Sequence, residues 1–171
     1  MLMNTSRIQF HNSVKSYLLV VLLGIFAEIL TRASDFFPYD TLWSFSSIAT
    51  LFGFWMLTTT LVIYFSCSSL NSGLNAFLYL FSMSFSFYFF QCVLGWFLPR
   101  FETSGFQTSV FLLYSALSVF CGLVGAVLYL WNRKGAWSLL YGLPVGGLLA
   151  EAIAVGLYLL NHHTFLFQLL F

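Results

Sequence analysis

Charged residues are scarce in this chain: Asp, Glu, Lys and Arg make up only 6% of its 171 residues. A soluble domain carries about 25% of these residues, because they cover the surface that faces water. Hydrophobic residues make up 60% of the chain and aromatic residues 21%, and the mean hydropathy is +0.92. The composition therefore excludes an ordinary soluble domain and predicts a protein whose solvent is the lipid bilayer.

Motifs that carry chemistry are missing as well. The net charge of +1 provides no basic surface, so nucleic acid is not an expected partner. Cys67, Cys92 and Cys121 lie far apart without metal-binding spacing, which predicts buried free thiols. No nucleophile elbow, zinc-protease motif or glycine-rich phosphate loop occurs. We expect no catalytic residue, no metal and no cofactor, and a membrane enzyme acting on a lipid is only a third hypothesis.

Long apolar stretches are what the sequence does contain. A membrane-spanning helix needs about 20 mostly apolar residues, and stretches of this kind cover residues 16–33, 42–65, 74–98, 109–131 and 136–160. Short polar segments separate them, and the tail 164–171 is too short to span and is expected to lie along the interface. The sequence predicts one all-α, polytopic domain with a bundle of about five transmembrane helices.

The positive residues predict the orientation of this bundle. Arg7 and Lys15 precede the first stretch, and Arg133 and Lys134 separate the fourth from the fifth. Cytoplasmic loops are enriched in Lys and Arg, so we expect the N-terminus inside and the C-terminus outside, in a multi-pass protein of the plasma membrane. The first stretch has features of a signal peptide, but Glu28 interrupts its apolar run, and we predict that it is retained.

Glu151 stands alone inside the apolar run 143–160. A carboxylate in hydrocarbon costs several kcal/mol unless it is neutralised, paired or reached by water. Three explanations are open: a protonated or hydrogen-bonded structural glutamate, a site for a ligand, cation or proton, or a charge pair with Arg32 or Arg100. Glu28 has a simpler explanation, since Arg32 follows it by four residues on the same helix face and can neutralise it.

Polar residues from several stretches fall at a similar depth. With the N-terminus inside, Glu28, Gln91 and Glu151 all lie in the outer half of the membrane, as do the serines of the second stretch. This coincidence predicts an outward-facing polar pocket. The candidate ligand-binding residues are Glu28, Arg32, Ser46, Ser47, Trp55, Ser82, Ser86, Gln91 and Glu151. If the first and fifth helices touch, Glu28 and Glu151 could share a proton.

Two of these candidates belong to a serine-rich segment. Ser82, Ser84 and Ser86 alternate with large residues, which is the period of a strand. We still predict a helix, because an open strand edge cannot lie in lipid. On a helix Asn75, Tyr79, Ser82 and Ser86 form one polar stripe, which either packs against a neighbouring helix or lines the pocket. Trp55, in the middle of the second stretch, is likewise either a packing residue or a pocket wall.

Small residues recur along the fifth stretch. Gly142, Gly146, Ala150 and Ala154 are spaced by four and form a smooth ridge that lets another helix approach closely. Glu151 lies next to this ridge and is expected to point into the bundle. Pro144 stands among glycines and predicts a kink or a break, which in transporters can supply a substrate site.

Two hypotheses of function follow. In the first, the protein binds or transports a small solute, cation or proton through the outward-facing pocket, with Glu151 at its centre. In the second, it is a non-catalytic accessory or assembly subunit of a larger membrane complex, and the ridge docks a partner helix. Five spans are few for an independent transporter, so a homo-oligomer or a partner membrane subunit is expected in either case.

Overall fold

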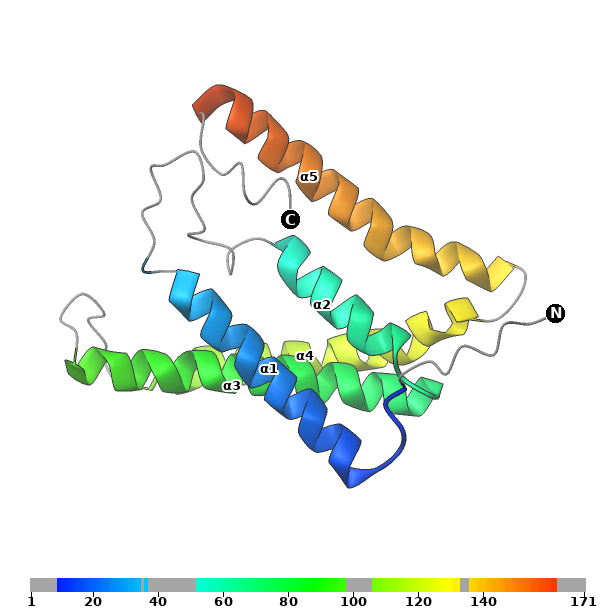
Figure 1. The fold of residues 1–171 in the computed structure, drawn as a ribbon, viewed down its shortest axis with the longest axis horizontal. Coiled ribbons are helices and arrows are strands. Elements are labelled where there is room, and N and C mark those ends of the chain that lie inside the picture. Colours follow the sequence, from blue (N-terminus) through cyan, green and yellow to red (C-terminus); the bar gives the residue numbers. More distant parts are fainter. Residues whose placement is uncertain (1–8, 35, 37–51, 98–105, 133–135, 163–171) are drawn as a thin grey trace.

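The computed structural model describes residues 9–34, 36, 52–97, 106–132 and 136–162. Within these residues the regular elements are helices (Figure 1). They are the α-helices α1 (Val14–Ser34), α2 (Phe52–Tyr64), α3 (Ser69–Phe97), α4 (Thr108–Leu128) and α5 (Gly142–His162), and the 3₁₀ helices η3 (Tyr129–Asn132) and η4 (Ala136–Tyr141). The predicted all-α class is confirmed.

Four segments within the described residues are long and apolar enough to cross a membrane: Val14–Ser34, Ser69–Phe97, Thr108–Leu128 and Ala136–Leu160. They correspond to the first, third, fourth and fifth predicted spans. The second span is described only from residue 52, as the 13-residue helix α2, and the rest of 42–65 lies outside the described residues. The inside position of the N-terminus stays a prediction, as does the interfacial tail 164–171.

Helix α3 begins five residues earlier than the sequence predicts, at Ser69 instead of residue 74. The predicted polar break is wrong there, because its polar side chains cap and anchor the helix. The Ser68 Oγ accepts a hydrogen bond from the backbone N–H of Asn71 at 3.2 Å, as the side chain of an N-cap residue does. Ser69 Oγ donates to the Ala126 carbonyl at 2.6 Å, and Ser72 Oγ donates to the Gly125 carbonyl at 3.1 Å. These bonds fasten the start of α3 to the end of α4.

Of the kink or break predicted around Pro144, the break is not formed. α5 runs unbroken from Gly142 to His162, so Pro144 lies in its first turn. The backbone N–H that proline lacks has no acceptor within the helix at this position, so proline is tolerated there. The change of helix geometry comes earlier, where η4 ends at Tyr141 and α5 begins at Gly142.

Helix α3 is the centre of the fold (Figure 1). It packs along α4, which lies behind it in the figure, and along α1, which crosses in front of it. Helix α2 packs on α3, and α5 lies at the edge of the molecule, where it packs mainly on α2. α1 therefore belongs to an α1–α3 interface, and α5 to a separate α2–α5 interface.

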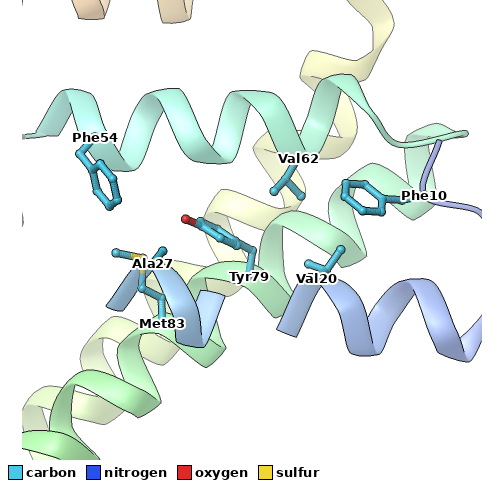
Figure 2. Packing of buried hydrophobic residues seen from close by; sticks show 7 residues of the cluster. All are labelled: Phe10, Val20, Ala27, Phe54, Val62, Tyr79 and Met83. Carbon is cyan, nitrogen blue, oxygen red and sulfur yellow. The ribbon is translucent and has the colours of Figure 1, made fainter. Parts of the chain in front are cut away.

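The buried apolar cluster joins α1, α2 and α3 (Figure 2). It consists of Phe10, Val20, Ala27, Phe54, Val62, Tyr79 and Met83. A close approach of α1 to α3 accompanies it, because a Cβ on Gly24 would lie 2.6 Å from the Tyr79 carbonyl oxygen. Helices α3 and α4 also approach closely, since a Cβ on Gly73 would lie 2.9 Å from the Gly122 carbonyl oxygen. Large apolar side chains outside this cluster, such as Leu112, Leu113 and Leu117 of α4, are mostly exposed. This surface suits hydrocarbon and not water.

Candidate functional site

The α1–α3 interface contains a buried ion pair. Glu28 is 0% exposed and Arg32 is 12% exposed, and the Arg32 Nε lies 3.2 Å from the Glu28 Oε1. The other carboxylate oxygen, Oε2, accepts a hydrogen bond from Thr31 Oγ1 at 3.0 Å. The expectation that Arg32 neutralises Glu28 is confirmed. The spacing of four residues on α1 brings the two side chains together.

Phe87 of α3 holds the cationic end of this pair. The Arg32 guanidinium carbon lies 3.8 Å from the centre of the Phe87 ring, and its Nη2 donates to the Phe87 carbonyl oxygen at 3.3 Å. A guanidinium over an aromatic face is attracted by the negative face of the ring. Arg32 is therefore committed to Glu28 and Phe87, and the arrangement fastens the end of α1 to α3.

A groove opens beside this ion pair, between the C-terminal halves of α1 and α3. Its volume is about 280 Å³, and its inner surface is apolar. The lining residues are Ile29, Arg32, Ala33, Phe36, Phe90, Val93 and Leu94. Arg32 contributes its hydrocarbon stem, because the guanidinium is turned toward Glu28 and Phe87. The groove is thus better suited to an apolar chain than to a polar solute.

Glu151 lies at the α2–α5 interface, and its Oε2 lies next to Gly53 of α2. The sequence predicted that Glu151 points into the bundle but not which helix it faces. A Cβ on Gly53 of α2 would lie 2.6 Å from the Glu151 Oε2, so the carboxylate lies close to the backbone of α2, although the end of this flexible side chain can shift to make room. This Oε2 atom is buried and has no hydrogen-bond partner within the described structure, although the residue as a whole is half-buried. One face of the carboxylate is therefore covered by α2, and the side chain lies at the edge of the interface.

The two intramembrane carboxylates belong to different interfaces. Glu28 is enclosed between α1 and α3, whereas Glu151 rests on α2. No contact joins them among the described residues, so the structure provides no basis for a shared proton. The charge pair considered for Glu151 and Arg32 is not formed either, because Arg32 is held by Glu28.

Of the remaining predicted site residues, Ser82 lies in the same α1–α3 interface as Glu28 and Arg32, and the other described ones lie on α3 or α2. Ser82 Oγ donates to the Tyr79 carbonyl at 2.9 Å and lies against Gly24, so it packs between α1 and α3. Ser86 is buried one turn further along α3, Gln91 is half-buried on the same helix, and Trp55 packs against the apolar cluster. Ser46 and Ser47 lie outside the described residues. The ligand-binding role of these residues stays a prediction.

An amide network at the opposite end of the bundle was not predicted. Asn75 is fully buried, and its Nδ2 donates to Ser66 Oγ at 2.9 Å and to Asn71 Oδ1 at 2.8 Å. Asn71 donates in turn to Tyr17 OH at 3.3 Å, which ties in α1. The Asn75 Oδ1 is buried without a hydrogen-bond partner in the part of the chain that the structure describes. The i, i+4 spacing of the two asparagines is a signal for this network, but it points to it only if Asn71 belongs to the helix, and the sequence predicts a polar break there.

The described part of the chain leaves the small-residue ridge of helix α5 uncovered. A Cβ added to Gly142 or Gly146 would meet nothing within 4 Å, and Ala150 and Ala154 are exposed. We call these four residues the α5 ridge. Six other helical glycines, by contrast, lie against a neighbouring helix: Gly24, Gly53, Gly73, Gly122, Gly125 and Gly147. The chain uses most of its helical glycines for close packing and leaves the two in this ridge free.

Comparison with protein-family models, with curated proteins and with solved structures finds no match for the chain. Within the described residues no three His, Cys, Asp or Glu side chains gather in a way that could hold a metal ion. The fold and the site together define the class of the protein. Within the described residues it is an all-helical protein with four segments able to span a membrane, a buried ion pair, and a peripheral helix with an open face.

Proposed function

We propose that the protein is a non-catalytic subunit of a membrane assembly, and that a partner helix docks on the α5 ridge. The observation that carries this proposal is the open space around Gly142 and Gly146 on a helix that packs on its own chain mainly through α2. From the positive residues near the N-terminus, we further propose a plasma-membrane location with that terminus in the cytoplasm.

The physical argument rests on how helices associate in lipid. The hydrophobic effect does not drive one apolar helix onto another there, so association depends on close van der Waals packing and interhelical hydrogen bonds. Small residues spaced by four provide the close packing, since they let two backbones approach. Within this chain, Gly24 and Gly73 do this for α1–α3 and α3–α4. The α5 ridge offers the same surface with none of the described helices on it.

The double substitution Gly146→Leu and Ala150→Leu tests this proposal. We expect the protein purified in mild detergent or native nanodiscs to migrate as a stoichiometric complex, with a second copy or another membrane protein, and the double variant to migrate as a monomer. The matched control is Ala116→Leu, at an exposed small residue of α4, and it should leave the complex intact. A wild-type protein that is monomeric under all these conditions, or a complex that tolerates both leucines, would refute the proposal.

Solute handling is retained as a second candidate because of one observation, the buried Glu151 Oε2 that has no hydrogen-bond partner within the described structure. A proton, a cation or a ligand with hydrogen-bond donors would satisfy this atom. Glu151→Gln should then change proton or cation uptake by vesicles containing the protein, while the helical content stays the same. Unchanged uptake would remove Glu151 from any such mechanism.

A further inference from the structure

We propose that Glu151 recognises the partner, by accepting a charge-assisted hydrogen bond from a Lys or Arg side chain on the partner's transmembrane helix. This inference rests on the proposed function, because it requires a helix docked along α5. It adds the chemistry that selects the partner: an apolar helix with one cation at the depth of Glu151.

The first step concerns the depth of the carboxylate. Glu151 stands near the middle of α5 (Gly142–His162), about 14 Å from its start and about 17 Å from its end at 1.5 Å per residue. A glutamate side chain cannot reach the membrane surface over either distance. Its carboxylate therefore has to be satisfied inside the hydrocarbon region, by a proton or by another side chain.

The second step concerns the cations of the chain itself. Of the six Lys and Arg residues of the chain, the structure describes Lys15 and Arg32, and neither of these two is available to Glu151. Outside the described residues lie Arg7, Arg133, Lys134 and Arg100, the other partner considered for Glu151. Lys15 lies in the first turn of α1 and is exposed. Arg32 is held by Glu28 at 3.2 Å and by Phe87 at 3.8 Å. On the α2 side, the Glu151 Oε2 lies next to Gly53, which has no side chain to donate.

The third step concerns access. Glu151 is only half-buried, and α2 covers it from one side. Ala150 and Ala154, which are adjacent to it and one turn beyond it, are exposed. A helix that packs on the ridge would therefore pass beside the carboxylate and bring a long cationic side chain within its reach. A second copy of this chain packed symmetrically on the same face would instead bring Glu151 toward Glu151, which like charges disfavour.

The test uses two synthetic transmembrane peptides as probes. Both are leucine-rich with small residues spaced by four, and they differ in one central position, which is Lys in one and Leu in the other. Association with the purified protein is measured by fluorescence energy transfer in neutral phosphatidylcholine vesicles. We expect the Lys peptide to bind the wild-type protein about tenfold more tightly than the Leu peptide, the size typical of a polar contact between membrane helices.

The variants separate this inference from the function on which it rests. Glu151→Leu should abolish the preference for the Lys peptide, and Glu151→Gln, which keeps the shape of the side chain, should reduce it. Gly146→Leu should weaken both peptides alike. Equal binding of the two peptides to the wild-type protein, or a preference that survives Glu151→Leu, overturns the role of Glu151 and leaves the docking ridge intact. If Gly146→Leu changes the binding of neither peptide, the α5 ridge is not the docking surface. If the protein associates with itself more strongly than with the Lys peptide, the partner is a second copy of the chain and the proposal of a cationic partner helix is overturned.

Discussion

Gly24 of α1 provides the sharpest test of the packing described above. A Cβ at this position would lie 2.6 Å from the Tyr79 carbonyl oxygen, whereas ordinary van der Waals contact begins near 3.4 Å. Ser82 Oγ is also in the way, but that side chain can rotate, whereas the Tyr79 carbonyl belongs to the backbone of α3. In Gly24→Ala the two helices must therefore move apart.

The magnitude follows from two opposing effects. Overpacking of this kind costs about 1–3 kcal/mol, and replacing glycine by alanine within a helix stabilises it by about 1 kcal/mol. Gly146→Ala is the matched control, since open space surrounds Gly146 and only the helix effect operates there. The helix effect cancels in the comparison, so Gly24→Ala should be less stable than Gly146→Ala by about 1–3 kcal/mol.

Reversible unfolding of the monomeric protein in mixed micelles of a mild detergent and dodecyl sulfate measures this difference. We expect Gly24→Ala to unfold at a lower fraction of dodecyl sulfate than the wild-type protein or at the same fraction, and Gly146→Ala at a higher one. If the two variants were equally stable, or if Gly146→Ala were the weaker, the close approach of α1 to α3 at Gly24 would be refuted.

Two further predictions concern the buried polar groups. Arg32→Leu leaves Glu28 buried without its cation and should lower the free energy of unfolding by about 3–5 kcal/mol. The double variant Glu28→Leu and Arg32→Leu should recover most of this loss. The same unfolding assay measures both, and a double variant no more stable than Arg32→Leu would contradict the pairing. Asn75→Ala removes the donor shared by Ser66 and Asn71 and should cost about 1–3 kcal/mol. Leu70→Ala at a 73% exposed position of the same helix is its control, and an equal effect of the two substitutions would argue against the network.

Some features of the site could be predicted from sequence and others could not. The ion pair of Glu28 and Arg32 was predictable because it lies within one helix, where a spacing of four residues fixes which side chains meet. Glu151 points toward the rest of the chain as predicted, but the predicted reason was wrong, because the described residues leave the neighbouring small-residue ridge uncovered. The sequence did not reveal which helix would face each carboxylate, because equal depth in the membrane says nothing about position around a bundle. The predicted common pocket required Glu28 and Glu151 to face the same space between helices. In the described structure they lie in different interfaces.

The sequence by itself determined the class of the protein and most of its helices. In hydrocarbon, a single apolar segment satisfies its backbone N–H and C=O groups by forming a helix. The length and apolarity of such a segment can be read directly from the residues. The tertiary structure alone decided that Ser69–Gly73 belongs to α3, because Ser69 and Ser72 anchor this segment by donating hydrogen bonds to distant carbonyl oxygens of α4. It also decided that Glu28 is enclosed while Glu151 lies at an edge, and that the α5 ridge is left open. These outcomes depend on which helices pack together, and that choice is made by contacts between residues far apart in the chain.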